Sequence, residues 1–200
     1  MTDVVDLSAP NPNGFTAMAD GTEEQWQHIT TAINHYNEGF VGRIVDTLWE
    51  LDEDAGGFAV TRLEHSLQSA TRAYRDDKDT EYVVCALLHD IGDMLAPYNH
   101  DQYAAAVLRP FVSDANHWMI EHHGVFQGYY FFDYLGLDKN MRDQYLGHEH
   151  YDRCAEFCHN YDQNSFDPSY DSMSVEDFIP ALQEVLGSGP RQSIYKAATP

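Results

Sequence analysis

The sequence predicts an all-α fold, a helical bundle that forms a single domain. Apolar residues recur at three- and four-residue steps through most of the chain, and this spacing places them on one face of a helix. Alternating patterns typical of strands are scarce. The 200 residues contain no internal repeat and no low-complexity linker, so the length suits one domain.

The first expected element is an irregular arm over residues 1–22, which are rich in proline, asparagine and glycine. The expected domain covers residues 23–186. It begins with helical periodicity over residues 23–52, which a glycine-containing break at 54–57 interrupts. A helix is expected next over residues 58–75, because its apolar residues fall on one stripe.

The following segment, residues 80–95, is apolar nearly all round and is therefore expected to be the central helix of the bundle, ending before Pro97. The remaining periodic segments predict helices over residues 101–112, 114–135, 143–160 and 176–186. Residues 187–200 start with a Gly-Ser-Gly-Pro stretch and are expected to form a loose C-terminal tail.

The charge balance bears on the kind of partner the protein binds. There are 33 acidic and 11 basic side chains, a formal net charge of −22, which repels nucleic acid and anionic lipid surfaces. We expect a small-molecule substrate, no nucleic acid and no membrane partner, and the oligomeric state stays open. Acidity that serves only solubility is the alternative interpretation.

The chain carries neither a basic, apolar N-terminal leader nor an apolar run of the roughly 20 residues that span a bilayer. Its three cysteines, Cys85, Cys154 and Cys158, form no paired framework and are too few for a thiolate zinc site. We therefore expect a reducing, cytoplasmic compartment.

A histidine and an aspartate stand together at the end of the central apolar segment, as His89-Asp90. An ionised aspartate in apolar surroundings is costly unless a partner compensates its charge, and a metal ion is a common partner. The alternative is an aspartate at a helix end beside a hydrogen-bonded core histidine.

Other candidate ligands are spread over about a hundred residues. His65 lies opposite the apolar stripe of its helix, which suits either a polar internal pocket or solvent. Four imidazoles and two carboxylates would suit iron, manganese or zinc, and Asp90 could bridge two ions. The remaining candidates follow in chain order as His100, the pair His122-His123, and Asp162.

This ordered series resembles the HD-domain superfamily. Residues 63–68 are similar to its first histidine motif, and residues 87–92 to its His-Asp signature. Residues 100–103, 120–123 and 158–162 are similar to later motifs of its diiron oxygenase branch, which includes myo-inositol oxygenase and organophosphonate-cleaving enzymes. The resemblance covers about residues 58–165.

The resemblance implies a site as well as a fold. It selects His123 over His122, because the ligand falls three residues after the isoleucine of that motif. It implies two iron ions as a mixed-valent Fe(II)/Fe(III) pair, with O2 as co-substrate. The implied ligand set is His65, His89 and Asp162 for one iron, His100 and His123 for the other, and Asp90 as the bridge.

Residues 122–132 and 161–164 are similar to a narrower subgroup, which converts (1-hydroxy-2-(trimethylammonio)ethyl)phosphonate to glycine betaine and phosphate. The chain departs from relatives at three places. Residues 54–58 lack the tyrosine and glutamate that accompany a primary-amine substrate. Asp93 and Gln127 stand where relatives carry basic side chains.

Six residues are candidates for substrate contact. Asp93, one turn beyond His89, and Gln127 are expected to be catalytic and to bind substrate. For Asp93 the alternative is a carboxylate that only hydrogen-bonds to groups around the metal ligands. Arg62 is expected to reach a phosphonate, with a surface salt bridge as the alternative. Tyr98, Tyr130 and Tyr161 are expected to contact a quaternary ammonium group, which binds well to aromatic faces. They belong to a set of seven rings, of which we expect two or three at the pocket: Tyr98, Trp118, Tyr129, Tyr130, Phe131, Phe132 and Tyr161.

Two other functions compete with C–P bond cleavage by an oxygenase. A metal-dependent HD phosphohydrolase acting on a nucleotide or small phosphate ester could use the same ligands. The shortage of basic residues near the motifs argues against it, because phosphate esters are usually held by lysine or arginine. A non-catalytic ligand-binding module is the third hypothesis, and the intact ligand series argues against it.

Overall fold

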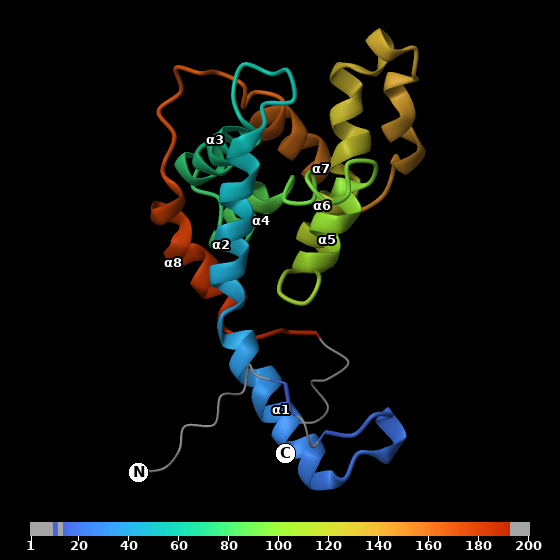
Figure 1. Cartoon of the computed structure of the whole chain (residues 1–200). Helices are drawn as coiled ribbons and strands as arrows, with labels where there is room; N and C mark the ends of the chain where they lie inside the picture. Colours follow the sequence, from blue (N-terminus) through green and yellow to red (C-terminus); the bar gives the residue numbers. More distant parts are fainter. Residues whose placement is uncertain (1–9, 12–13, 193–200) are drawn as a thin grey trace.

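The computed structural model describes residues 10–11 and 14–192, and within these ranges helices are the only regular secondary structure. The expected all-α class is confirmed. The helices that build the body divide into a group around α4 and a group formed by α5, α6 and α7 (Figure 1). Their bounds are α1 Glu23–Glu38, α2 Phe40–Glu50, α3 Arg62–Arg75, α4 Thr80–Leu88, α5 His100–Leu108, α6 Asp114–Gln127, α7 Tyr151–Phe157 and α8 Val175–Leu186.

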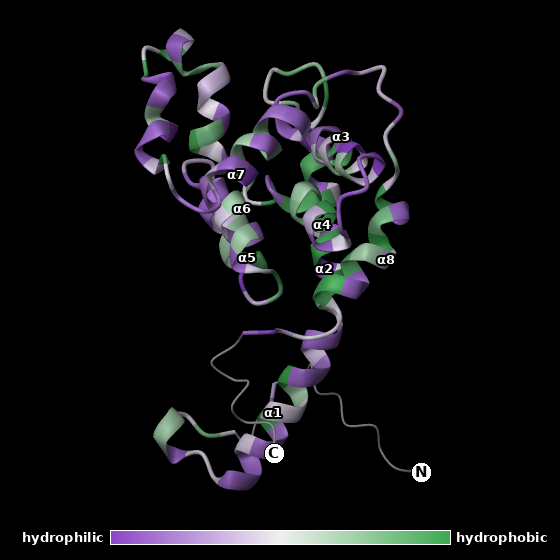
Figure 2. Ribbon diagram, turned by 180° about the vertical axis from the view of Figure 1, so that it is seen from behind, coloured by the Kyte–Doolittle hydropathy of each residue, from purple (hydrophilic) through white to green (hydrophobic). Residues whose placement is uncertain are grey.

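The centre of the bundle is α4, as its apolar sequence predicts. Every residue from Tyr82 to Leu88 is buried. The Asp79 side chain caps the helix by accepting a hydrogen bond from the Tyr82 amide at 2.8 Å. Helices α3, α6 and α8 contact α4, and the hydrophobic residues gather on the helices around it (Figure 2). The C-terminal end of α4 is thereby held in the interior, where the His-Asp pair follows.

The expected helix over 80–95 is wrong in its second half, because α4 ends at Leu88 and a series of turns follows. Gly92 lies against the start of α5, where a β-carbon would come within 2.8 Å of the His100 carbonyl oxygen. The turn therefore brings His100 back beside Asp90, which a continuous helix could not do.

Other helix boundaries also differ from expectation. Helix α5 ends at Leu108 instead of at 112. Helix α3 begins at Arg62 instead of 58, because the Thr61 hydroxyl accepts from the Glu64 amide and caps it there. Helix α6 ends at Gln127 and gives way to 3-10 turns. Helix α7 begins only at Tyr151, because Gly147 adopts a left-handed φ of 89° that interrupts the expected helix.

The N-terminal part divides at Gly39 into two helices. Helix α1 projects from the body (Figure 1) and has no buried residue, whereas α2 joins the core through Val41, Ile44 and Leu48. At the other end, the amides of Arg191 and Gln192 donate to the Pro110 carbonyl. The expected arm and tail lie partly outside the described residues, so the division into arm, domain and tail stays a prediction.

The described helices include none that is long and apolar enough to cross a membrane. The three cysteines are buried thiols without disulfides. Cys85 belongs to the core as expected, and Cys154 and Cys158 donate to carbonyls of α6.

Truncating Leu87 at the centre of the bundle is expected to destabilise the protein strongly. Its side chain is fully buried, so Leu87→Ala should lower the free energy of unfolding by about 2–5 kcal/mol. Leu135→Ala, at a leucine that is 64% exposed, is the matched control and should change it little. Urea unfolding of the two variants measures this, and equal losses would contradict a core centred on α4.

Candidate metal centre

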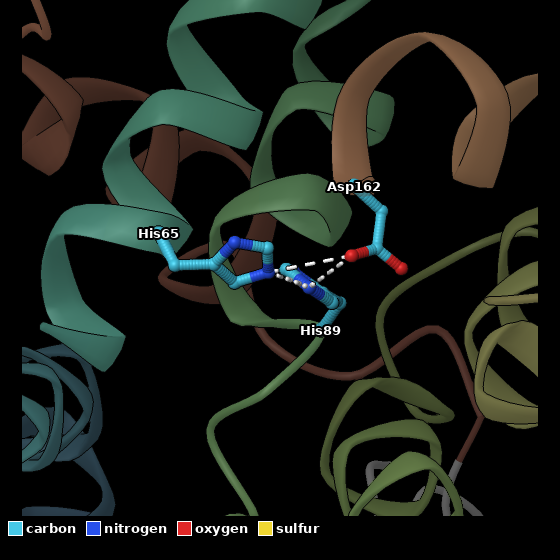
Figure 3. Close-up of side chains that lie close together, drawn as sticks. All are labelled: His65, His89 and Asp162. Atoms are coloured by element: carbon cyan, nitrogen blue, oxygen red, sulfur yellow. Dashed lines mark hydrogen bonds and ion pairs between the residues drawn. The ribbon is translucent and has the colours of Figure 1, made fainter. Parts of the chain in front are cut away.

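Six side chains from different parts of the chain converge on one point. His65 comes from the first half of α3, and His89 immediately follows α4. Asp90 begins the turn after α4, and His100 is the first residue of α5. The other two are His123 in α6 and Asp162, the last residue of the short π-helix η6, Cys158–Asp162. Figure 3 shows His65, His89 and Asp162 pointing toward one another from three elements.

His65 is 4% exposed, so the alternative of a solvent-facing histidine is wrong. The reason is that the polar face of α3 is covered by the chain from Tyr161 onward. Gln68 donates to the Asp167 carbonyl at 2.8 Å, and Ser69 donates to the Tyr161 carbonyl at 3.4 Å. This cover places polar residues of α3 inside the molecule, where His65 reaches the cluster.

One half of the cluster contains His65, His89 and Asp162. The Nε2 atoms of the two histidines lie 3.1 Å apart. Asp162 Oδ1 is 3.3 Å from His65 Nε2 and 3.8 Å from His89 Nε2. Asp90 Oδ2 faces the same atoms, at 3.4 Å from His65 and 3.3 Å from His89.

The other half contains His100 and His123, which face the second oxygen of Asp90. Asp90 Oδ1 lies 3.4 Å from His100 Nε2 and 3.2 Å from His123 Nε2. A single carboxylate therefore stands between two groups of ligand atoms, with one oxygen directed to each. This is the arrangement that a carboxylate bridging two cations requires.

Backbone carbonyls orient three of the imidazoles. His65 Nδ1 donates to the Ser165 carbonyl at 3.0 Å, His89 Nδ1 to Ala86 at 2.8 Å, and His123 Nδ1 to Ile120 at 2.7 Å. In the neutral imidazole a protonated Nδ1 leaves a lone pair on Nε2. The Nε2 lone pairs of these three residues therefore point into the cluster, which suits a metal ion.

The electrostatics of the cluster call for positive charge. Burial lowers the pKa of His65, but its hydrogen bonds to Asp162 and Asp90 outweigh burial and raise it to about 10. Burial likewise opposes the effect of Asp90 on His123, whose pKa is raised to about 9. Burial raises the pKa of Asp90, yet the neighbouring imidazoles, His89 foremost, hold it well below its ordinary value. The negative charge of the two carboxylates is thus balanced either by protons on these imidazoles or by a bound cation.

The donor set fits one or more metal ions. His65, His89 and Asp162 offer atoms within 4.8 Å of one another, as do His89, Asp90 and His123. Asp162 Oδ2 is buried and has no hydrogen-bond partner among the described residues. A buried carboxylate oxygen without a donor is costly, and coordination of a cation would compensate it.

The neighbouring His122 points elsewhere. Its ring stacks on Trp118 with centroids 4.2 Å apart, and its Nδ1 donates to the Trp118 carbonyl at 2.9 Å. The geometry therefore brings His123 to the cluster and leaves His122 in an aromatic group that includes Tyr145 and His148.

A pocket of about 540 Å³ opens over the cluster, which is a usual size for a small-molecule site. His65, Asp90, His100, His123 and Asp162 reach its wall, whereas His89 lies below them with no exposed surface. The other lining residues are Ala55, Phe58, Val60, Thr61, Arg62, Asp93, Pro97, Gly124, Gln127, Tyr130, Phe131, Gln163 and Phe166.

Four of the six expected substrate residues line this pocket. Arg62 forms an ion pair with Asp93, and Asp93 Oδ1 lies 3.4 Å from His100 Nδ1. Burial and the Asp90 carboxylate raise the pKa of Asp93 against the opposing charges of His100 and Arg62. Gln127 donates to Asp162 Oδ1 at 2.9 Å, and its own Oε1 is buried without a partner among the described residues. The fourth is Tyr130.

Two expected substrate residues, Tyr98 and Tyr161, lie away from this pocket. Tyr98 is fully exposed and does not line the pocket, because the turn around Pro97 carries it outward. Tyr161 is buried on the far side of η6, where it packs against Tyr82 and its hydroxyl donates to Asp76 at 3.2 Å. Neither ring lines the pocket as the structure has it.

Two aromatic residues that line the pocket, Phe58 and Phe166, were not predicted from the sequence. Phe166 stacks on His65 with ring centroids 4.4 Å apart, and Phe58 stacks on Phe166 at 4.7 Å. The signal in the sequence is the spacing, since Phe166 lies four residues, about one helical turn, after Asp162. Of the seven rings considered, Tyr130 and Phe131 line the pocket, which agrees with the expected two or three.

Comparison with known proteins agrees with this geometry. The family model for the HD domain matches residues 62–160. Over 83 residues the chain is 36% identical to a (1-hydroxy-2-(trimethylamino)ethyl)phosphonate dioxygenase (glycine-betaine-forming) of Leisingera caerulea, covering 36% of this chain and 41% of that protein. It is 34% identical over 90 residues to a hydroxymethylphosphonate dioxygenase of Gimesia maris, covering 37% and 45%.

The chain spans less than half the length of the curated relatives that it matches. The match to the family model includes the first histidine, the His-Asp pair and the two later histidines, and it ends just before Asp162. The His89-Asp90 pair at the end of α4 lies within the matched residues. Residues 62–160 of the chain therefore form an HD domain.

Proposed function

We propose that the chain is an HD-type diiron oxygenase that cleaves the C–P bond of a 1-hydroxyalkylphosphonate. The preferred substrate in this proposal is (1-hydroxy-2-(trimethylammonio)ethyl)phosphonate, with glycine betaine and phosphate as products. The observation that carries the proposal is the buried cluster in which Asp90 separates two groups of ligand atoms at the floor of a pocket. The printed activities of the two matched relatives support the reaction class.

In this proposal His65, His89 and Asp162 would hold one iron and His100 and His123 the other, with Asp90 as a ligand available to both. A mixed-valent iron pair would supply the reactivity toward O2 that protein side chains lack. One O2 balances the reaction, since the hydroxyl-bearing carbon becomes a carboxylate, the C–P bond breaks, and phosphorus leaves as phosphate. The protein's own contribution is to hold the ligands, orient the substrate and exclude water.

The pocket offers distinct surroundings for the two ends of this substrate. Phe58, Phe166, Tyr130 and Phe131 supply aromatic surface, which attracts a quaternary ammonium group. Arg62 is the one arginine or lysine among the lining residues. Its Nε donates to Asp54 and its Nη1 to Asp93, and its Nη2 stays available to a ligand. The phosphonate would therefore rely on the metal ions and on this single guanidinium edge.

Gln127 and Asp93 act beside the ligands in this proposal. Gln127 donates to Asp162 Oδ1, which restrains that carboxylate, and its amide oxygen is buried without a partner among the described residues. Asp93 lies between Arg62 and His100. Both side chains line the pocket and can contact the substrate once it lies over the cluster.

Oxygen uptake tests the proposed reaction. Protein reconstituted with Fe(II) and partly oxidised should consume O2 when the trimethylammonium hydroxyphosphonate is added, and should release one phosphate per O2. Anaerobic conditions should stop phosphate release. Hydroxymethylphosphonate and the aminoethyl analogue, run in parallel, measure which substituent the pocket accepts.

The result that would overturn the proposal is release of phosphate from simple phosphate esters without oxygen, which would identify a phosphohydrolase instead. Arg62 is the one arginine or lysine among the lining residues, so it is available equally to a phosphonate and to a phosphate ester. The requirement for oxygen therefore decides between the two reactions.

A further inference from the structure

One of the four clustered histidines is held differently from the others. The Nδ1 atoms of His65, His89 and His123 donate to backbone carbonyls, which no side-chain substitution removes. His100 instead faces a carboxylate, with its Nδ1 3.4 Å from Asp93 Oδ1. Its side chain is 28% exposed, whereas those of His65, His89 and His123 are 6%, 0% and 2% exposed. At its Nδ1, His100 therefore relies on a neighbouring carboxylate where the other three histidines rely on the backbone.

Asp93 is in turn fixed by a guanidinium. Its second oxygen accepts a hydrogen bond from Arg62 Nη1, and the Asp93 side chain is only 10% exposed. The Nε of Arg62 donates to Asp54 at 3.2 Å. An unbroken chain of side chains thus runs from Asp54 through Arg62 and Asp93 to His100.

The loop that starts this chain is built to receive the arginine. Gly56 adopts a left-handed φ of 56°, its amide donates to Asp54 Oδ1 at 3.1 Å, and a β-carbon there would lie 2.8 Å from Arg62 Nη2. The Arg62 amide also donates to the Asp54 carbonyl at 3.1 Å. The guanidinium is therefore held in one orientation from both sides, and this fixes the carboxylate that faces His100.

We infer that Asp93 is a positioning residue for His100. Of the two proposed metal positions, the one at His100 and His123 therefore depends on the Asp54–Arg62–Asp93 chain of side chains for its affinity, and the other does not. The inference rests on the proposed function, because it takes the cluster to hold two irons. A carboxylate that accepts from the outer nitrogen of an imidazole ligand fixes its ring and raises its basicity. In the proposed arrangement the ion at His100 and His123 would have these two imidazoles and Asp90 as its protein ligands, so the loss of one oriented imidazole would leave it poorly held.

The test compares iron binding by the full chain with Asp93→Asn, Asp93→Glu and a control. Asp93→Asn keeps the shape but loses the charge, and loss of such a partner typically lowers metal affinity about 10- to 100-fold. We expect wild type to retain two irons per chain after gel filtration and Asp93→Asn to retain about one. Asp93→Glu should recover part of the second iron. The control, Asp171→Asn, alters a carboxylate that is 97% exposed and pairs with Arg75, and it should retain two.

A spectroscopic readout separates positioning from general damage to the fold. The electron paramagnetic resonance signal of a coupled Fe(II)/Fe(III) pair should disappear in Asp93→Asn, while its thermal unfolding in the metal-free state stays close to wild type. Two irons bound with wild-type affinity in Asp93→Asn would overturn the inference and leave the proposed function standing. A wild-type chain that takes up no iron would overturn both.

Discussion

Asp90→Ala is expected to abolish binding of both metal ions and, with it, oxygen uptake. One carboxylate faces both groups of ligands, through Oδ2 toward His65 and His89 and through Oδ1 toward His100 and His123. Without Asp90 one proposed ion would keep only His100 and His123 as ligands. The other would keep His65, His89 and Asp162, and no carboxylate would link the two positions. The substitution also removes a negative charge from a buried site that needs charge balance to hold two cations.

Metal analysis of the purified variant measures the loss, and thermal unfolding with and without Fe(II) gives a second readout. Because ligand that binds only the folded state stabilises it, wild type should gain about 4 kcal/mol at a free metal concentration near 1,000 times Kd. Asp90→Ala should gain almost nothing. The control, Asp152→Asn, changes an exposed aspartate of α7 and should behave like wild type. Normal metal content in Asp90→Ala would refute the bridging role.

Without metal, the protein is expected to lose stability as the pH rises from about 7 to above 10. The pKa of His65 is raised to about 10 and that of His123 to about 9, because Asp162 and Asp90 outweigh the opposing effect of burial. A group whose pKa is higher in the folded state than in the unfolded state stabilises the fold below its unfolded pKa, near 6.5. This stabilisation is lost as the pH passes through 9 to 10.

The rises from 6.5 to about 10 and to about 9 together correspond to a loss of at most about 8 kcal/mol, since one pKa unit corresponds to about 1.4 kcal/mol. In a domain of this size that amounts to up to roughly 20 °C in Tm. Bound metal supplies the positive charge at all these pH values, so the loaded protein should lose much less over the same range. Differential scanning calorimetry of both forms measures the difference, and parallel pH curves would contradict a carboxylate-rich site that needs a cation.

Much of the fold followed from local patterns. The segment at 80–88 is apolar on every side, and no arrangement except burial satisfies such a helix, so its central place could be predicted. The helix boundaries were harder, because they depend on caps and close contacts. Thr61 starts α3 by capping it, and Gly147 interrupts the helix expected before α7.

The sequence predicted which residues are candidate ligands, but not how they lie relative to one another. His65 is the clearest example, because it lies on the polar face of an amphipathic helix, and such a face usually contacts water. The chain after Tyr161 covers that face through hydrogen bonds to Gln68 and Ser69, and these contacts join residues nearly a hundred positions apart. No local pattern contains such information.

The sequence by itself determined the helical class, the central helix and the chemical types of the candidate ligands, because helix periodicity and residue chemistry are local properties. Only the tertiary structure decided that Asp90 stands between two groups of ligands, that Phe58 and Phe166 line the pocket, and that Tyr98 and Tyr161 do not. The physical reason is that a site is made by side chains meeting across elements. Their meeting depends on packing, turn geometry and long-range hydrogen bonds, which the periodicity of a single segment does not encode.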